Sequence, residues 1–308
     1  MSQGQRVITE QKDNRSNRTV QAAWGVLAVW VEELDFRRIF PAFLIIILIL
    51  PNIQAQYRPR IMTLNPGEEI KYDVYLKWGL LMPRAGEARV SFNQSIYKGE
   101  PVSLYRLIFH TANIFETIYK MRDTLNCYYN SDNVLFYSPK HTIEGGYDLM
   151  DELTFTYTGE KTSIHSLRYT PTVKKIDTTL MVSSGYVFDM LGATFYVRTL
   201  DRKNLKIGDV FPCTVITGRS LIPTSFRYEG QAIVERDNIK YNTHYYVIDV
   251  HDEVFSRKKA SAEVWIGDDD NYIPIKIRTK LIIGYAEVHY KSSVNLKNPL
   301  NCRAEIKK

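Results

Sequence analysis

The chain has 308 residues, of which 44% are hydrophobic and 24% charged, so it can bury a sizeable core and wholesale disorder is excluded. Tyr (21) and Phe (13) are plentiful beside moderate Gly (16) and Pro (12), a balance that favours β-structure. The formal net charge is +6, but the basic residues are scattered, whereas a nucleic-acid-binding protein gathers them on one element. The tight basic triplet Arg257-Lys258-Lys259 fits a solvated loop better than a phosphate or lipid-headgroup contact.

The segment "RRIFPAFLIIILILPNIQAQ", which begins at Arg37, has the order of a secretory signal. Two arginines precede an apolar run from Ile39 to Leu50, Pro51 interrupts it, and a small residue follows at Ala55. The run is shorter than the roughly 20 residues that a membrane-spanning helix needs. We therefore predict cleavage after Ala55 with Gln56 as the mature N-terminus; an uncleaved signal anchor is the alternative. No cysteine lies near the cut, so a lipoprotein is not predicted.

The residues before this signal are too many for an ordinary n-region. They are polar as far as Thr19 and then carry the apolar patch "AAWGVLAVWVEEL", which suggests a misassigned start and a true start near Val31 or Leu34. Residues 1–55 are accordingly interpreted as an N-terminal extension plus signal peptide. Residues 56–66 are interpreted as an extended, mobile segment.

From Glu68 onward, short segments with alternating apolar and polar residues follow one another, separated by turn signals such as "MPRAG" and "NSDN". This rhythm predicts a mainly β fold: a large antiparallel curved sheet, as an open barrel or a sandwich, with one or two short helices packed against it. No composition break divides the segment, so residues 67–292 are predicted to be a single β-rich domain and 293–308 a C-terminal tail. Two closely apposed halves are the alternative.

One segment has helical rather than strand periodicity. In "SSGYVFDMLGATFYVRTL" the apolar residues recur at i, i+3 and i+4, at Val187, Met190, Leu191 and Phe195. We predict a helix from Tyr186 to Arg198, with Ser183 or Ser184 as its cap. A second short helix is predicted near Ala112.

Three consecutive carboxylates raise the question of a metal site. Gly267, Asp268, Asp269, Asp270 and Asn271 lie between two strand-like runs. An EF-hand loop needs alternate oxygen ligands and a Glu at position 12, but here Tyr272 takes the place of the third ligand and Thr279 that of the twelfth. Gly, Asp and Asn are the residues that turns select. We therefore predict a hairpin turn without metal, with Pro274 at an edge or strand start.

Other searches for reactive groups identify no candidate. Cys127, Cys213 and Cys302 match no zinc or redox spacing, and either one disulfide or three separate buried thiols is compatible with the sequence. No nucleophile elbow, zinc-protease motif or phosphate-binding loop is present. His244 and His251 lie seven apart on a predicted strand and would face opposite sides. No catalytic residue and no cofactor are predicted.

Several motifs in order carry a family resemblance. They begin with "GEEIKYDVYLKWGLLMPRAGEARVSF", continue through "YVFDMLGATFYVRTLDRKNLKIGDVF" and end with "AEVWIGDDDNYIPIKIRTKLIIGYAEVHY". The set resembles a family of exported proteins of Gram-negative (Bacteroidetes-type) bacteria, domain of unknown function 3108, over nearly all of residues 65–292. The resemblance implies an exported β-rich domain without established activity, so no catalytic residue can be carried over. Asp268 and Pro274 occupy the family's recurrent D and P, and the 55-residue leader departs from its usual short signal.

Three functions are compatible with these observations. The first is a non-enzymatic periplasmic or envelope module that binds an apolar or amphipathic ligand such as a lipid, with Met190, Leu191, Phe195 and Trp78 as ligand-binding candidates. The bland alternative is that these residues only fill the core. The second is an envelope scaffold or assembly factor that binds a protein partner through exposed Trp78 and Tyr285. The third is a hydrolase acting on cell-wall polymers, which would need two carboxylates facing a groove. No nucleic-acid partner is predicted, and membrane contact is predicted only through the signal segment before cleavage.

Overall fold

The computed structural model describes residues 64–77, 79–112, 114–170, 177–202, 204–250, 259–281 and 284–304. Residues 1–63, which include the predicted signal and the cleavage site Ala55–Gln56, therefore lie outside the described residues. The same holds for Trp78, His251, Arg257, Lys258 and the side chain of Lys259. No helix in the described part of the chain is long and apolar enough to cross a membrane.

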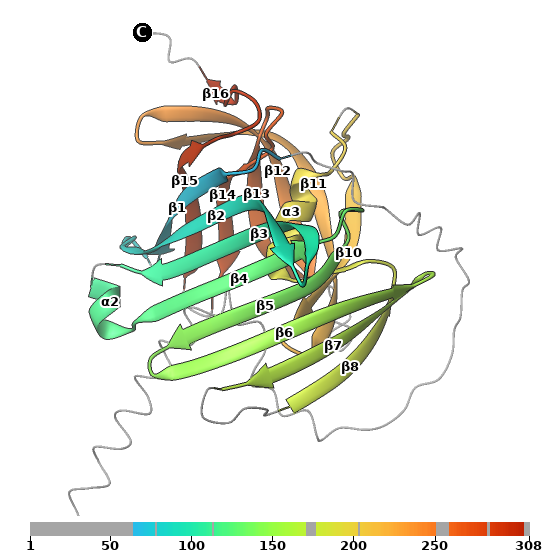
Figure 1. Ribbon diagram of the computed structural model, residues 1–308. Coiled ribbons are helices and arrows are strands. Elements are labelled where there is room, and N and C mark those ends of the chain that lie inside the picture. The colour runs from blue at the N-terminus through green and yellow to red at the C-terminus, as the bar shows by residue number, and fades with distance from the viewer. Residues whose placement is uncertain are drawn as a thin grey trace, which may run out of the picture.

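The described strands form one 16-stranded sheet that curves until it is nearly closed into a barrel (Figure 1). Its first half contains β1 (Glu68–Lys77), β2 (Arg84–Tyr97), β3 (Glu100–Thr111), the short helix α2 (Ile114–Ile118), β4 (Met121–Tyr129), β5 (Leu135–Glu144), β6 (Tyr147–Thr158), β7 (Lys161–Tyr169) and β8 (Asp177–Ser184). Its second half contains β9 (Val187–Phe188), the helix α3 (Met190–Arg198), β10 (Val210–Thr217), β11 (Ser220–Arg236), β12 (Ile239–Val250), β13 (Lys259–Gly267), β14 (Pro274–Lys280), β15 (Tyr285–Val294) and β16 (Arg303–Ala304). The predicted mainly β, curved antiparallel sheet is confirmed.

Most strands pair with their neighbours in sequence, and one long-range pairing joins the two halves. The order along the sheet is β8-β7-β6-β5-β4-β3-β2-β1-β15-β14-β13-β12-β11-β10-β9, with β16 beside β12. β1 pairs antiparallel with β15, so that Val74 lies opposite Val288. This pairing unites the first and last long strands of the domain. Register shifts in the ladders, for example between Tyr228 and Gly230, add the local twist that bends a sheet.

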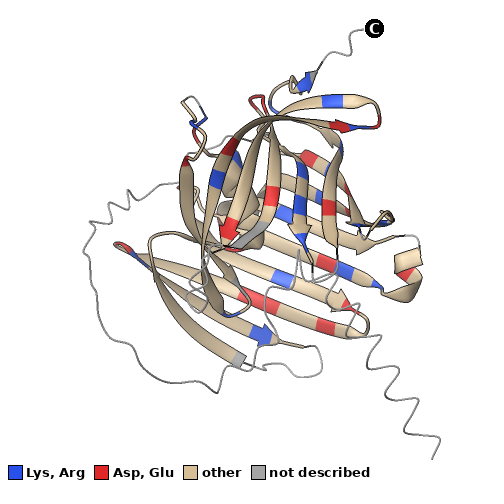
Figure 2. Ribbon diagram, turned by 180° about the vertical axis from the view of Figure 1, so that it is seen from behind, with Lys and Arg blue, Asp and Glu red and all other residues tan. Residues whose placement is uncertain are grey.

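Strict alternation of side chains creates the interior. In β1, Ile70, Tyr72, Val74 and Leu76 are buried, while the residues between them are partly exposed. β4 alternates in the same way along its whole length. Because successive residues of a strand point to opposite faces, the inner faces combine into an apolar core. In the view of Figure 2, Lys and Arg are spread over separate strands and do not form one basic face.

The helix α3 lies inside the curve of the sheet and begins later than the sequence predicted. It runs from Met190, not Tyr186, and its N-cap is Asp189, whose side chain accepts a hydrogen bond from the backbone N of Gly192. Ser183 and Ser184 do not cap it, because their backbones pair with β7. Val187 and Phe188 form β9, a short parallel partner of β10. Strand pairing thus overrides the helical spacing in this stretch.

A buried ion pair fixes the other end of α3. Arg198 and Glu68 are 1% and 2% exposed, and Arg198 Nη1 donates to Glu68 Oε1 at 2.6 Å. The same guanidinium donates from Nη2 to the backbone oxygen of Asn271 at 2.9 Å. The contact joins the end of α3 to the start of β1 and to the β13–β14 turn, so the position of the helix inside the barrel is set at both ends.

Residues on both sides of the predicted domain 67–292 pack against the barrel. Leu64, placed in the mobile segment by the sequence, is buried in the core. β15 extends to Val294, and the following residues are not a free tail, since Cys302 is 0% exposed and β16 pairs with β12. Asn and Pro dominate "NLKNPLNC", and this composition is typical of a loop whether or not the loop packs.

Candidate functional site

An apolar cavity of about 200 Å³ lies inside the barrel, between α3 and strands from both walls. The residues that line it are almost all apolar. They are Val74 and Leu76 of β1; Leu107 and Phe109 of β3; Met121, Asp123 and Leu125 of β4; Met190, Leu191, Ala193, Thr194 and Val197 of α3; Val215 of β10; Ile222, Thr224 and Phe226 of β11; Ile248 and Val250 of β12; Ala262 and Val264 of β13; Pro274, Ile277 and Thr279 of β14; and Ala286 and Val288 of β15.

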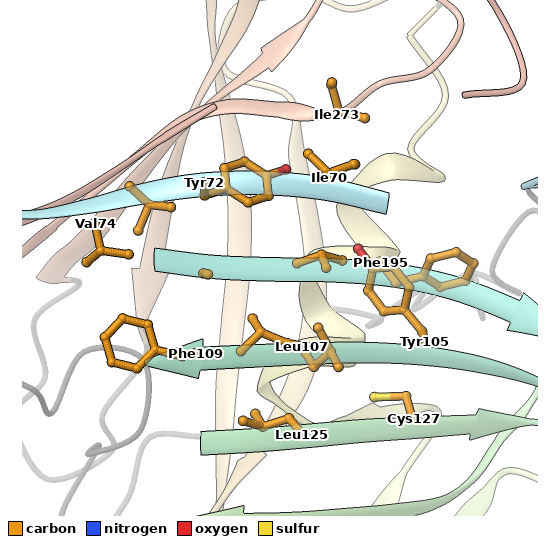
Figure 3. Close-up of a cluster of buried hydrophobic side chains, with 14 of the residues drawn as sticks. Ile70, Tyr72, Val74, Tyr105, Leu107, Phe109, Leu125, Cys127, Phe195 and Ile273 are labelled. Atoms are coloured by element: carbon orange, nitrogen blue, oxygen red, sulfur yellow. The ribbon is translucent and has the colours of Figure 1, made fainter. Parts of the chain in front are cut away.

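The strand pattern explains this lining. Leu107 and Phe109 are two apart on β3, and Leu125 on β4 lies directly opposite Leu107. Figure 3 shows these side chains on the same side of their strands, facing the interior. Equivalent positions on β11 to β15 supply the opposite wall. The cavity is therefore the part of the barrel interior that the two walls and the helix leave unfilled.

The helix contributes a different set of residues from the one predicted. Met190 and Leu191 line the cavity, as a ligand-binding role requires. Phe195 does not: its ring packs between those of Tyr105 and Tyr129, with centroids 5.2 Å from each (Figure 3 shows it beside Tyr105). Ala193, Thr194 and Val197 also line the cavity and were not predicted as site residues. For Ala193 the available signal was size, since a small residue on a bulky apolar helix leaves space where a large aromatic residue fills it.

Hydrogen bonds to Asp189 hold the start of α3 against β4 and β5. The Cys127 thiol donates to Asp189 Oδ1 at 3.1 Å, and the Ser138 hydroxyl donates to Asp189 Oδ2. Burial raises the pKa of the Asp189 carboxyl, and the donors from Ser138, Cys127 and Gly192 oppose that rise. Asp189, Cys127 and Ser138 are buried and bond to one another. Their role is therefore structural: they position the helix that covers the cavity.

Asp123 is the exceptional residue of the lining. It occupies an inward position of β4 between Met121 and Leu125, opposite Phe109 on β3, and is 3% exposed. Its Oδ1 atom has no hydrogen-bond partner among the described residues. Burial raises the pKa of this carboxyl to about 7; the charge of Lys140 opposes the rise and that of Glu144 adds to it. The alternation of β4 places this aspartate on the apolar face with Met121 and Leu125, so the sequence held a signal for it that was not used.

The row of aspartates lies in the connection between the antiparallel strands β13 and β14. Asp268 Oδ1 lies 2.9 Å from His244 Nε2, whereas Asp269 accepts from the backbone N atoms of Asn271 and Cys302. The backbone oxygen of Asp270 accepts from the Asn298 amide at 3.4 Å. The carboxylates of Asp268 and Asp269 therefore have separate partners, and Asp270 is held through its backbone. In the described ranges no group of three or more His, Cys, Asp or Glu side chains could hold a metal ion.

The remaining predicted residues are distributed over other parts of the barrel. Gly267 ends β13, and its N donates to the backbone oxygen of Ile273, while Pro274 begins β14 and contributes to the cavity. Tyr285 is 39% exposed with the guanidinium of Arg278 5.4 Å from its ring centroid. Cys127, Cys213 and Cys302 are three free thiols, two of them buried and Cys213 half-buried.

A family model matches residues 71–290, which cover the barrel from β1 to β15. The family is described as protein of unknown function DUF3108. The chain belongs to this family. The DUF3108 match spans both walls of the cavity and α3, so the cavity is part of the family domain and not of an addition to it.

Among solved structures, the DUF3108 chain resembles a β-barrel-like protein of domain of unknown function DUF1849 from Brucella abortus. The two are 12% identical with a TM-score of 0.50, over 76% of this chain and 99% of the other. At this identity the likeness shows a shared barrel-like fold. No curated protein matches the chain.

Proposed function

We propose that this protein is a non-enzymatic binding module that takes an apolar or amphipathic ligand into the barrel cavity. One observation carries the proposal: about 200 Å³ of space with an almost entirely apolar lining lies inside the barrel. Protein interiors are close-packed, with few voids larger than a water molecule. Apolar atoms that line an unfilled space lose packing contacts, so the space lowers the stability of the fold. A ligand that fills the space recovers this stability.

The size of the cavity limits the ligand. An engineered apolar cavity of about 150 Å³ holds benzene, so a space of 200 Å³ encloses about eight carbon atoms. A two-chain lipid is too large to be enclosed. The proposed ligand is therefore a small apolar molecule, or one short hydrocarbon chain of a larger amphipath.

The leader sequence supports a location for this activity. Arg37 to Ala55 have the order of a secretory signal, and we propose that cleavage there releases the barrel into the periplasm or outer envelope. In that compartment, lipids and their breakdown products would be available to the cavity.

Filling the cavity tests the proposal. Ala193→Leu on α3 and Ala286→Leu on β15 place extra carbon atoms in the space from opposite walls. Ala232→Leu is the matched control, because Ala232 is half-buried on β11 and does not line the cavity. The measurement is isothermal titration of the purified, delipidated protein with 1-octanol.

We expect 1-octanol to bind the wild type and the control equally, and each cavity variant at least tenfold more weakly. Native mass spectrometry of protein from its own host should show a co-purified small apolar molecule that is lost from the filled variants. Absence of octanol binding by the folded wild type, or equal binding by both filled variants, would refute the proposal.

A further inference from the structure

We propose that Asp123 is the ligand's polar anchor, and that the ligand is a single-chain amphipath whose head donates a hydrogen bond, a hydroxyl or a protonated amine. This inference rests on the proposed function, because it assigns the chemistry of the molecule in the same cavity. It adds that the ligand has a fixed orientation, with its chain among the apolar residues and its head at β4.

The unpartnered oxygen is the first argument. Asp123 Oδ1 is buried, belongs to a residue that lines the cavity, and makes no hydrogen bond to another described residue. The Thr142 hydroxyl, opposite Asp123 on β5, is buried and without a partner as well; it lowers the pKa of the carboxyl, but it does not line the cavity. Buried polar groups in proteins nearly always have a hydrogen-bond partner, so a specific exception calls for a reason. A donor carried by the ligand supplies the missing partner.

The three threonines of the lining already have interactions of their own, which strengthens the assignment; that of Thr279 lies outside the two described next. Thr194 donates to the backbone oxygen of Leu191 at 2.7 Å, and Thr224 donates to that of Ile222 at 3.1 Å. These hydroxyls bond within their own elements. Asp123 is the one carboxyl in the lining, and it lies between apolar neighbours on its strand. A ligand head thus meets one dominant polar group.

The charge of Asp123 determines which head is favoured. Burial raises the pKa of its carboxyl to about 7, so at pH 8.5 the group is mainly an anion in an apolar site. Lys140 and Glu144 act on it with opposite signs, and Lys140 has a further interaction of its own. An ammonium or hydroxyl head donates to the anion, whereas a carboxylate head meets a like charge.

The test uses three probes with the same chain and different heads: 1-octylamine, 1-octanol and octanoate, each below its micelle-forming concentration. They are titrated at pH 8.5 into delipidated wild type, Asp123→Asn and Asp123→Leu. The control Asp148→Asn removes a carboxylate from β6 that pairs with His141, at 2.7 Å, outside the cavity. The key quantity is the ratio of octanoate to octylamine dissociation constants, because both heads are charged and both lose hydration on entry.

We expect this ratio to be at least 100 in the wild type and in Asp148→Asn, and to fall at least tenfold in Asp123→Leu. Asp123→Asn, nearly identical in shape, should give the same fall and shows that the loss does not come from misfolding. A wild-type ratio within threefold of one, or a ratio unchanged in both Asp123 variants, overturns the assignment of Asp123 as the anchor. If octanol still binds in that case, the proposed cavity function stands. If no probe binds the folded wild type, the cavity function itself fails.

Discussion

Removing the charge of Asp123 should stabilise the protein in alkaline solution and much less in acid. The carboxyl has a pKa of about 7 in the folded chain because of burial, against about 4 in an unfolded chain. The folded state therefore binds this proton more tightly. The contribution to stability is full below about pH 4 and is lost as the pH rises through about 7.

The magnitude follows from the shift of about three pKa units, each equivalent to about 1.4 kcal/mol. The wild type thus carries a penalty of about 4 kcal/mol at pH 8, where the folded group is ionised. At pH 5 the penalty is only about 1.4 kcal/mol, because the folded carboxyl is then protonated and only the unfolded one is largely ionised. Asp123→Asn has no such titration, so its stability relative to the wild type should increase by about 2 to 3 kcal/mol between pH 5 and pH 8.

Urea unfolding of delipidated wild type and variant, followed by circular dichroism at both pH values, measures this difference. Comparison of the two proteins cancels the titrating groups that do not interact with Asp123. Lys140, His141 and Glu144, which act on Asp123 from β5, contribute to the measured difference. Asp148→Asn should show no comparable pH-dependent gain. A difference between wild type and Asp123→Asn that is the same at pH 5 and pH 8 would show that the carboxyl is not desolvated in the folded protein.

Three further predictions concern the framework around the cavity. Arg198→Met should lower the free energy of unfolding by about 3 to 5 kcal/mol, because it leaves Glu68 buried without its partner. The double variant with Glu68→Leu should recover a large part of that loss, and urea denaturation measures both. Asp189→Ala should lower the free energy of unfolding by about 2 kcal/mol or more, since it removes the cap of α3 and leaves the Ser138 and Cys127 donors unpaired. Urea denaturation measures this loss, and Thr178→Ala, at an exposed position of β8, is the control. The three thiols, Cys127, Cys213 and Cys302, should resist a thiol reagent at pH 8 in the native protein and all react after unfolding. Burial raises the pKa of each, that of Cys213 to about 12. Rapid labelling of any of them in the native protein would contradict this.

Prediction from sequence worked where one strand suffices to specify the structure. The alternation in "IKYDVYLK" identifies both the strand β1 and its buried face, because side chains of a strand point to alternate sides regardless of its partner. The cluster Gly267 to Asn271 could likewise be judged from residue types alone, since its turn is local. The helix was recognised by its spacing, but its start was misplaced, because Val187 and Phe188 pair with β10, which begins more than twenty residues later.

Residue order alone was enough to predict the strands, their inner and outer faces, a curved sheet and the resemblance to the family. It could not predict that β1 meets β15, that Phe195 turns away from the cavity while Ala193 faces it, or that the Asp123 carboxyl has a buried oxygen without a hydrogen bond. Periodicity records which side of an element is apolar, whereas a cavity and an unpaired carboxyl depend on the volumes and donors that distant strands bring opposite each residue.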